Sequence, residues 1–295
     1  MAEKIHLMAD SPCDIPREDV EKYGIEIIGV DITYDGQTKQ EFYEIDPPDY
    51  WKDLERLEEI PVTAQVTPAR YLDLFLKAKT AGCTHLMCMT ISSTASGTFN
   101  SGVVAKGLFY EEHGDAMRIE MVDSRGYSMV YGQVLLEAAR MRDEGRSFDD
   151  ILAAAREGCA RAEALFLVYS LKHLKKSGRI TGAAAFVGEA LGLRPVLRCI
   201  DGVITIVQKA RGDKNVGGAM VAELQKCIKN PETQDIIVVH ADVPETEIQH
   251  IEALLHENFH PKSVRRAYLG PCVTTNTGPN ALGIVYFGEK RALES

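Results

Sequence analysis

The chain contains no long hydrophobic run, no closely spaced pair of cysteines and no excess of positive charge. No segment approaches the ~18 consecutive apolar residues that a membrane-spanning helix requires, and the N-terminal stretch MAEKIHLMADS has only a short apolar run before Asp10. The seven cysteines include no C-x-x-C pair, a pattern that indicates neither a disulfide framework nor a structural zinc site. Together these absences predict a cytoplasmic protein with no membrane span.

The charge balance is acidic. The 33 Lys and Arg residues are outnumbered by 43 Asp and Glu residues, which gives a net charge of -10 and a pI near 5.4. Nucleic acid and anionic membrane surfaces repel such a chain at long range, so neither is an expected partner. A length of 295 residues is enough for two domains, or for one large domain, with a full hydrophobic core.

The stretch LMCMTISSTASGTFNSG, residues 86–102, carries the densest signal. An apolar run of strand length leads into a loop rich in hydroxyl side chains, after which apolar residues recur at helical spacing. Ser96 and Gly97 then fall near the start of a helix, where backbone N–H groups lack partners and attract an anion. A Ser at this place also caps its own helix, and both interpretations stay open. The hydroxyl residues are Thr90, Ser92, Ser93, Thr94, Ser96 and Thr98.

Two further strands of the expected sheet end in an Asp-Ser pair, at Asp10-Ser11 and at Asp123-Ser124. In a parallel α/β sheet, the carboxyl ends of the strands face the crevice in which ligands bind. Ser11, Ser124 and the hydroxyl-rich loop are therefore expected to converge on one site. Capping of the following helix explains each Asp-Ser pair equally well.

Residues 1–163 predict an α/β/α domain with a mostly parallel sheet. Short apolar segments that end in turn residues alternate with segments of helical periodicity. Thr67 followed by Pro68 is typical of a helix N-cap and first position, whereas residues 34–46 are polar around a turn. The predicted strands are 4–9, 25–32, 86–89 and 118–122, and the predicted helices are 16–23, 50–57, 69–80, 127–144 and 147–163.

The pattern changes after residue 163. The segment VLRCIDGVITIVQK alternates around Asp201-Gly202, which is a strong hairpin signal. A hairpin followed by further strands implies a mixed or antiparallel sheet, so residues 164–295 predict a second domain of the α+β class. The other predicted elements are a strand over 165–169, a nearly uncharged helix over 183–193, a helix over 244–259 and strands in IIVVHAD, SVRRAYLG and ALGIVYFG.

Six spaced motifs of the chain occur in the same order in a known family. They are TAQVTP near residue 63, TISSTASGTFNS, MVDSRGYSMVYG, KSGRITGAAAFVG, LRPVLRCIDGVI and GPCVTTNTGPNALGI. On these motifs the chain resembles the DegV family of fatty-acid-binding proteins. The resemblance extends from DSPCDIP at residue 10 to the last strand.

This resemblance implies a bacterial lipid carrier rather than an enzyme. Two α/β domains are expected to enclose one long-chain fatty acid, with the acyl tail buried and the carboxylate near the domain junction. The fatty acid is a ligand, and no cofactor is expected. Proteins of this kind look like carriers that present the acid to a separate fatty acid kinase, which phosphorylates its carboxyl group with ATP. The carrier itself is expected to be a monomer.

The resemblance also implies roles for individual residues. The family's Thr and Ser that bind the carboxylate correspond to Thr63 and Ser96. Asn276 stands where the family usually has a His, so an amide donor is kept but a titratable group is lost. Arg211 corresponds to an Arg that is implicated in engaging the kinase.

Further pocket candidates come from the neighbouring segments. Arg179 in SGRI either caps a backbone carbonyl or neutralises the head group. The apolar face of residues 183–193 forms either one wall of an acyl tunnel or ordinary core packing. These additional candidates are Ser93, Thr94, Gly97, Thr98, Arg179, Phe186 and Thr275.

A zinc hydrolase is one alternative to the carrier. HENFH fits the H-E-x-x-H pattern, with His256 and His260 on one helical face and Glu257 beside them. Pro261 ends that helix at once, and no third ligand follows on a plausible helix. We therefore predict no metal site.

A serine hydrolase is the other alternative. The loop contains Ser92, Ser93 and Ser96, but a serine nucleophile needs a base within ~3 Å. His85 lies at the start of the preceding strand, remote from its hydroxyl end, and the chain has no G-x-S-x-G elbow. We therefore predict no catalytic residue.

Overall fold

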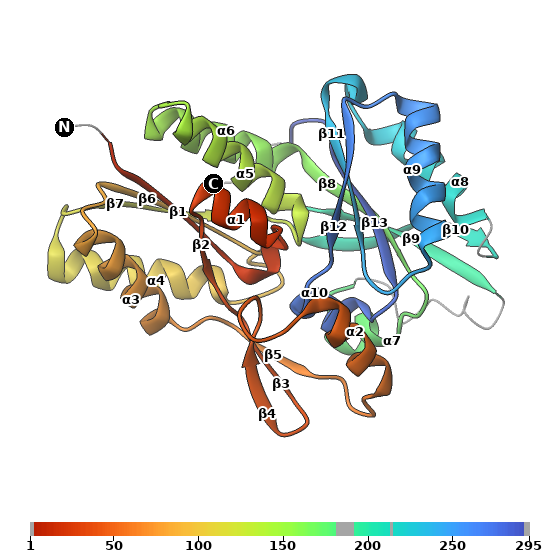
Figure 1. Ribbon diagram of the computed structural model, residues 1–295, viewed down its shortest axis with the longest axis horizontal. Helices are drawn as coiled ribbons and strands as arrows, with labels where there is room; N and C mark the ends of the chain where they lie inside the picture. The colour runs from red at the N-terminus through yellow and green to blue at the C-terminus, as the bar shows by residue number, and fades with distance from the viewer. Residues whose placement is uncertain (1–2, 181–191, 213–214, 292–295) are drawn as a thin grey trace.

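The computed structural model describes residues 3–180, 192–212 and 215–291. Its strands form two large sheets that lie side by side, together with one small sheet (Figure 1). The first large sheet has four parallel strands in the order β2-β1-β6-β7. They are β1 (Ile5–Asp10), β2 (Glu26–Ile28), β6 (His85–Thr90) and β7 (Arg118–Asp123).

Helices cover both faces of this parallel sheet, as the alternation of strand and helix predicts. Helices α3 and α4 pack together on one face, and α5 and α6 pack together on the other (Figure 1). The Thr67 hydroxyl caps α3 by accepting a hydrogen bond from the Arg70 N–H, as predicted. The helices are α1 (Arg17–Tyr23), α3 (Pro68–Thr80), α4 (Thr98–His113), α5 (Met129–Asp143) and α6 (Phe148–Arg161).

The second large sheet is mixed and has the strand order β10-β9-β8-β13-β11-β12. Strands β11 and β12 run parallel, and the other neighbouring strands described pair antiparallel. Hairpin β9–β10 turns at Asp201-Gly202, as predicted, with positive φ at both residues. The strands are β8 (Ala162–Val168), β9 (Leu193–Ile200), β10 (Val203–Arg211), β11 (Asp235–His240), β12 (Ser263–Tyr268) and β13 (Ala281–Phe287).

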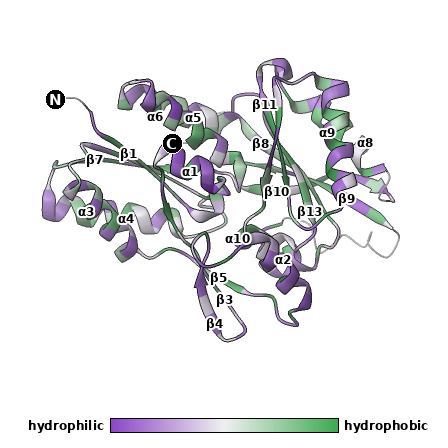
Figure 2. Cartoon of the chain, in the orientation of Figure 1, coloured by the Kyte–Doolittle hydropathy of each residue, from purple (hydrophilic) through white to green (hydrophobic). Residues whose placement is uncertain are grey.

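The two faces of the second sheet are buried against different partners. On β8, Leu165 and Leu167 belong to the core beneath α8 and α9, whereas Ala164 and Val168 belong to the core shared with the first sheet. Adjacent strand residues point to opposite faces, so this strand is apolar on both sides, and the strands of this sheet are mostly green in Figure 2. The covering helices are α8 (Val216–Cys227) and α9 (Glu245–Phe259).

The remaining elements are short and lie near the junction of the two large sheets (Figure 1). The polar segment 34–46, whose turn was predicted, contributes a hairpin to a small antiparallel sheet of order β4-β3-β5. The last glycine-rich segment forms helix α10, which the sequence pattern does not predict. These elements are β3 (Asp31–Tyr34), β4 (Gln37–Gln40), β5 (Val62–Ala64), α2 (Pro47–Arg56), α7 (Lys172–Ser177) and α10 (Pro271–Thr277), with 3-10 turns at Ser11–Cys13 and Pro231–Thr233.

The predicted fold class is confirmed, because a parallel sheet with helices on both faces is followed by a mixed sheet. The boundary between residues 1–163 and 164–295 stays a prediction. Most of the helix predicted over 183–193 lies outside the described residues. Within the described ranges, no helix is both long enough and apolar enough to cross a membrane.

Candidate ligand-binding site

A pocket of about 270 Å³ lies between the inner face of the second sheet and the loops that follow strands of the first. This volume is close to the lower end of the roughly 300–1,000 Å³ that is typical of small-molecule sites. Residues far apart in the sequence, from Pro12 to Val285, form its wall. Most of them are apolar, among them Ile91, Val130, Phe166, Ile204, Val239 and Val285.

The loops after β1, β6 and β7 all reach this pocket, through Pro12, Ser96 and Tyr127 respectively. Their convergence follows from the parallel pairing of the three strands, whose carboxyl ends lie at one edge of the sheet. Ser11 and Ser124 are not among the lining residues described, and their hydroxyls form hydrogen bonds with neighbouring protein groups instead.

A buried carboxyl group at the end of β1 holds the start of the hydroxyl-rich loop. The two oxygens of Asp10 accept hydrogen bonds from the Ile91 N–H at 3.0 and 3.1 Å, and Oδ1 accepts one from the Tyr131 hydroxyl at 2.7 Å. Burial raises the pKa of Asp10 to about 7. Asp10 thereby fixes the point at which the chain leaves β6 toward Ser96.

Several hydroxyls of the loop have partners within the protein. The Ser93 hydroxyl donates to Asp123 Oδ2 at 2.5 Å, and the Thr94 hydroxyl donates to the Gly202 carbonyl at 3.2 Å. The Thr98 hydroxyl is buried and accepts a backbone N–H hydrogen bond. These three predicted candidates are not among the described residues that line the pocket, so the structure places them around the site rather than in its wall.

Two of the predicted hydroxyl residues line the pocket, Thr63 on β5 and Ser96 just before α4. Ser128 and Thr277, which were not predicted, line it as well. Ser96 Oγ accepts a hydrogen bond from the Thr98 N–H at 3.3 Å. Ser96 lies one residue before the N-cap of α4, which is Gly97, and its own O–H is still able to donate. Gly97 also lines the pocket, and a Cβ there would overlap the Gln65 side chain. Among the described residues, the Thr63 hydroxyl has no hydrogen-bond partner. Both hydroxyls are thus able to donate to an anion.

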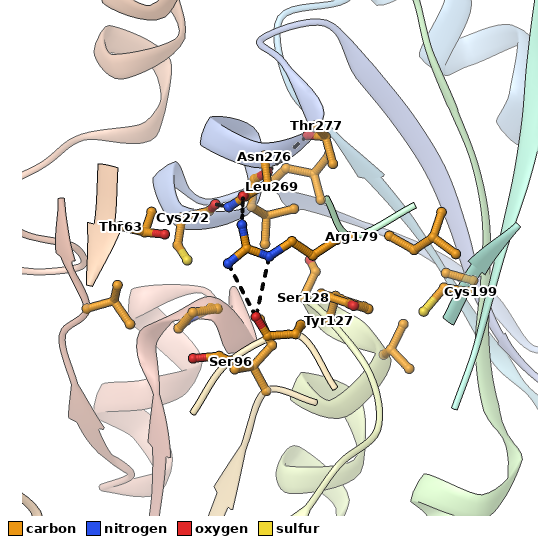
Figure 3. A pocket seen from close by; sticks show the side chains of 18 of the residues that line it. Thr63, Ser96, Tyr127, Ser128, Arg179, Cys199, Leu269, Cys272, Asn276 and Thr277 are labelled. Atoms are coloured by element: carbon orange, nitrogen blue, oxygen red, sulfur yellow. Dashed lines mark hydrogen bonds between the residues drawn. The ribbon is translucent and has the colours of Figure 1, made fainter. Parts of the chain in front are cut away.

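Arg179 brings a positive charge to the same part of the pocket (Figure 3). Its Nη1 donates to Asn276 Oδ1 at 3.1 Å, and its Nε and Nη2 each lie 3.4 Å from the Ala95 carbonyl oxygen. The Asn276 amide is oriented in turn, because Nδ2 donates to the Cys272 carbonyl at 2.8 Å. In Figure 3 the guanidinium lies between Asn276 and the loop that carries Ser96.

Three other predicted residues have different positions. Thr275 donates to the Pro271 carbonyl at 2.7 Å and lies 2.6 Å from the Tyr50 hydroxyl, outside the described lining. Arg211 is the last residue of β10 and is exposed, also outside that lining. Phe186 lies outside the described residues.

The inner face of the second sheet supplies the apolar wall. Ile204, Cys199, Ala164 and Val285 form one row across β10, β9, β8 and β13, because each is paired in register with the next. All four line the pocket. Burial raises the pKa of the Cys199 thiol to about 12, so this thiol stays protonated at neutral pH and adds no charge.

A buried pair of carboxyl groups, Glu41 and Asp14, lies between the segment after β1 and the start of α10, and the sequence patterns did not predict it. Glu41 Oε1 accepts from the Cys272 N–H at 2.6 Å, and Oε2 accepts from the Ser11 hydroxyl at 2.5 Å. Burial raises the pKa of Glu41 to about 7, and burial together with the nearby Glu41 charge raises the pKa of Asp14 well above its usual range. Glu41 therefore connects α10 to the segment after β1, but its polar sequence context gives no hint of this.

The structure gives little support to the hydrolase alternatives. His260 follows the last residue of α9 in a left-handed conformation, whereas His256 is still within the helix. The described residues contain no group of three or more His, Cys, Asp or Glu side chains that is able to hold a metal ion. His85 Nδ1 lies 2.9 Å from the Thr84 hydroxyl at the start of β6, at the opposite end of that strand from the loop containing Ser96.

Comparison with known proteins places the whole fold in one family. Residues 4–289 match the family model described as "Uncharacterised protein, DegV family". A DegV domain-containing protein of Caldanaerobacter subterraneus is 28% identical over 288 residues, which cover 98% of this chain and all of that protein. A DegV domain-containing protein of Listeria innocua is 28% identical over 289 residues, which cover 97% of this chain and 99% of the relative.

Solved structures agree with this assignment. The chain superposes with a TM-score of 0.85 on a DegV family protein from Thermus thermophilus, at 24% identity, over 97% of this chain and all of that one. DegV from Bacillus subtilis gives a TM-score of 0.81 at 26% identity, over 98% of this chain and all of that one. A protein from Eubacterium ventriosum gives a TM-score of 0.83 at 25% identity, over 99% of this chain and all of that one. Since the family model covers nearly its whole length, this chain belongs to the DegV family.

Proposed function

We propose that this protein binds one long-chain fatty acid, with the acyl tail in the pocket and the carboxylate at Thr63, Ser96 and Arg179. The proposal depends mainly on the division of the pocket into an apolar wall and a polar end. Its wall on the second sheet is apolar, while the hydroxyl side chains and the Arg179 guanidinium group that line it come from β5, α10 and the loops. A ligand with one anionic group and one long apolar chain matches both parts.

Burial of the acyl chain supplies most of the binding free energy in this proposal. Each buried methylene contributes about 0.8 kcal/mol, so the ~14 methylenes of a common fatty acid contribute on the order of 11 kcal/mol before the cost of ordering. The head group then needs orientation more than affinity. Two neutral hydroxyls and the N–H groups at the start of α4 satisfy a carboxylate, and Arg179 balances its charge.

Relatives of known structure support the same ligand class. DegV from Bacillus subtilis, 26% identical to this chain, is described as a fatty acid binding protein. The Eubacterium ventriosum protein, 25% identical, is described as a stearic acid-binding protein. We extend this ligand class to the present chain because its pocket has both an apolar wall and hydroxyl donors.

We further propose that the protein is a carrier and not itself the enzyme that modifies the acid. The chain lacks the G-x-x-x-x-G-K-[ST] and G-x-G-x-x-G patterns that bind nucleotide phosphates. Arg179 is exposed, so a carboxylate beside it is within reach of a second protein. A separate fatty acid kinase is the partner that the family resemblance implies, with Arg211 as a contact. A cytoplasmic monomer remains part of the proposal.

Extraction of lipid from the purified protein tests the ligand assignment. Protein produced in a bacterial host is expected to release close to one equivalent of fatty acid into organic solvent, identified by mass spectrometry. Delipidated protein is then titrated with hexadecanoic acid, and with hexadecanol as a neutral ligand of equal chain length. A protein that is empty after purification and binds neither ligand would rule out the acyl pocket.

A further inference from the structure

The tip of the β9–β10 hairpin contacts the hydroxyl-rich loop of the first sheet. The Gly202 carbonyl oxygen accepts two hydrogen bonds, from Thr94 Oγ1 at 3.2 Å and from the Tyr127 hydroxyl at 2.8 Å. Thr94 Oγ1 also lies 2.8 Å from Ser92 Oγ, which in turn accepts from the Thr94 N–H at 3.3 Å. Hydroxyls from loops after two different strands thus hold one backbone carbonyl of the second sheet.

The fit around Gly202 is tight. Gly202 has a φ of +74°, which suits glycine, and an added Cβ would overlap both Ser92 Oγ and Thr94 Oγ1. The hairpin turn therefore sits directly against these hydroxyls. Such close packing fixes the position of the turn relative to the loop, so neither segment is able to move without displacing the other.

The two partners in this contact belong to opposite parts of the pocket. Cys199 and Ile204, on either side of the hairpin turn, lie on the apolar wall. Ser92, on the loop side, accepts backbone hydrogen bonds from the N–H groups of Ala95 at 3.0 Å and Ser96 at 3.2 Å. The loop turn that presents the Ser96 hydroxyl is thus anchored at the residue that also contacts Thr94.

From this arrangement we infer that Thr94 and Tyr127 are positioning residues for Ser96. By holding the Gly202 carbonyl, they fix the Ser92–Ser96 turn and so direct the Ser96 hydroxyl toward the head group of the ligand. This inference builds on the proposed function. Thr94 acts on the ligand only through Ser96, because its own hydroxyl donates to the Gly202 carbonyl of the hairpin.

The contact can be weakened without unfolding the hairpin, since the turn has a second anchor. Arg291 Nε donates to Asp201 Oδ1 at 3.1 Å, and Arg291 Nη1 donates to Glu163 Oε1 at 2.9 Å. Thr94 itself is exposed. Replacement of its hydroxyl by a methyl group therefore removes its hydrogen bonds with the Gly202 carbonyl and the Ser92 hydroxyl and leaves the core unchanged.

The test compares Thr94→Val, Thr94→Ser and Tyr127→Phe with the wild type. Affinities for hexadecanoic acid and hexadecanol are measured by calorimetry on delipidated protein. Thr94→Val is expected to lower the affinity for hexadecanoic acid roughly 3- to 10-fold, the range of one hydrogen bond, and to leave the affinity for hexadecanol unchanged. Tyr127→Phe should also lower the affinity for the acid. Thr94→Ser keeps the hydroxyl and should have the same ratio of acid to alcohol affinity as the wild type. Thr80→Val is the matched control, because Thr80 is also exposed and donates to a backbone carbonyl, that of Leu76 at 2.8 Å.

A double-mutant cycle separates positioning from simple structural support. If Thr94 acts through Ser96, Thr94→Val has no further effect on acid affinity in a Ser96→Ala background. An unchanged ratio of acid to alcohol affinity in Thr94→Val, or a full additional loss in the double variant, would overturn the inference. Failure of the wild type to bind either ligand would instead overturn the proposed function.

Discussion

The polar end of the pocket and its apolar wall are built from different kinds of structure. Thr63, Ser96 and Arg179 come from a short strand, a loop and the segment after a short helix. Thr63 is held by the pairing of β5 with β3, Ser96 by a hydrogen bond with the Thr98 N–H, and Arg179 by hydrogen bonds to distant segments of the chain. The apolar wall is the regular face of one sheet, where Ala164 is paired in register with its neighbours. In the proposed function, the wall therefore determines whether an acyl chain is bound, and the polar end determines which head group is preferred.

Buried acids differ between the two regions as well. In the second sheet, Glu163 is paired with Arg198 at 2.7 Å and with Arg291 at 2.9 Å. Behind the polar end, Glu41 has hydrogen-bond donors but no Lys or Arg ion pair among the described residues. A buried carboxyl group without a cation favours its protonated form. The stability of the region around Glu41 is therefore expected to depend on pH more than that of the region around Glu163.

The largest effect is expected from filling the apolar wall. Ala164→Phe places a ring in the middle of the row formed with Cys199 and Val285, where the acyl chain would lie. We expect co-purified fatty acid to fall to a few per cent of the wild-type amount, measured by extraction and mass spectrometry. The matched control is Ala219→Phe in α8, which enlarges an alanine of the core on the other face of the sheet. If Ala164→Phe retains the full amount of fatty acid, the acyl chain does not lie on the inner face of the second sheet.

A smaller effect is expected at the polar end. The double variant Thr63→Ala, Ser96→Ala removes two hydroxyl donors, and hydrogen bonds to charged groups contribute about 1.5–3 kcal/mol each. We expect at least about 100-fold weaker binding of hexadecanoic acid, unchanged binding of hexadecanol and a melting temperature within a few degrees of the wild type. Equal loss of both ligands would mean that these residues shape the pocket instead of binding the head group.

The next prediction concerns pH and the carboxyl groups behind the polar end. Because the pKa of Glu41 is raised to about 7 in the folded state, its stabilising contribution is fully present below its unfolded pKa and is lost as pH rises through about 7. The free energy of unfolding of the wild type should therefore fall between pH 5 and pH 8, and Glu41→Gln should reduce that fall by an amount on the order of 2 kcal/mol. Denaturant unfolding at each pH measures both. Glu58→Gln, at an exposed acid, is the control and should leave the pH dependence unaltered.

The smallest effect on lipid binding is expected from Arg211→Ala. This exposed residue ends β10 outside the described pocket lining, so fatty acid content and affinity should equal those of the wild type. In a coupled assay with a cognate fatty acid kinase, the same variant should slow formation of acyl phosphate by at least about tenfold, the loss of roughly one charged contact. Equal rates would remove Arg211 from the kinase-contacting surface.

Local sequence signals predict elements well but not the contacts between them. The parallel sheet, the Asp201-Gly202 turn and the Thr67 cap each depend on adjacent residues, and each is confirmed. Helix α10 is missed because its residues have a mixed, weakly helical composition in which tertiary packing decides the conformation. The contact between Thr94 and Gly202 joins residues 108 positions apart, and no local pattern encodes it.

The same limit applies to the candidate site. Thr63 and Ser96 were predicted by motif resemblance, and the structure places both beside one pocket, whereas the buried Glu41 and Asp14 pair gave no signal. A buried acid is recognised only by what surrounds it in space. The hydroxyl-rich loop was visible as a composition, but the division of its hydroxyls among Asp123, Gly202 and the pocket was not.

Strand β13 occupies the centre of the second sheet although it is the last strand along the chain, between β8 and β11. During synthesis, β8 to β12 emerge from the ribosome before the strand that joins their two halves. Ala281 and Val285 of β13 line the pocket, so the pocket is incomplete in any nascent chain that lacks these residues. In the proposed function, binding of a fatty acid therefore follows the synthesis of β13, and until then the inner faces of β8 and β11 depend on rapid completion of the sheet or on chaperones to avoid aggregation.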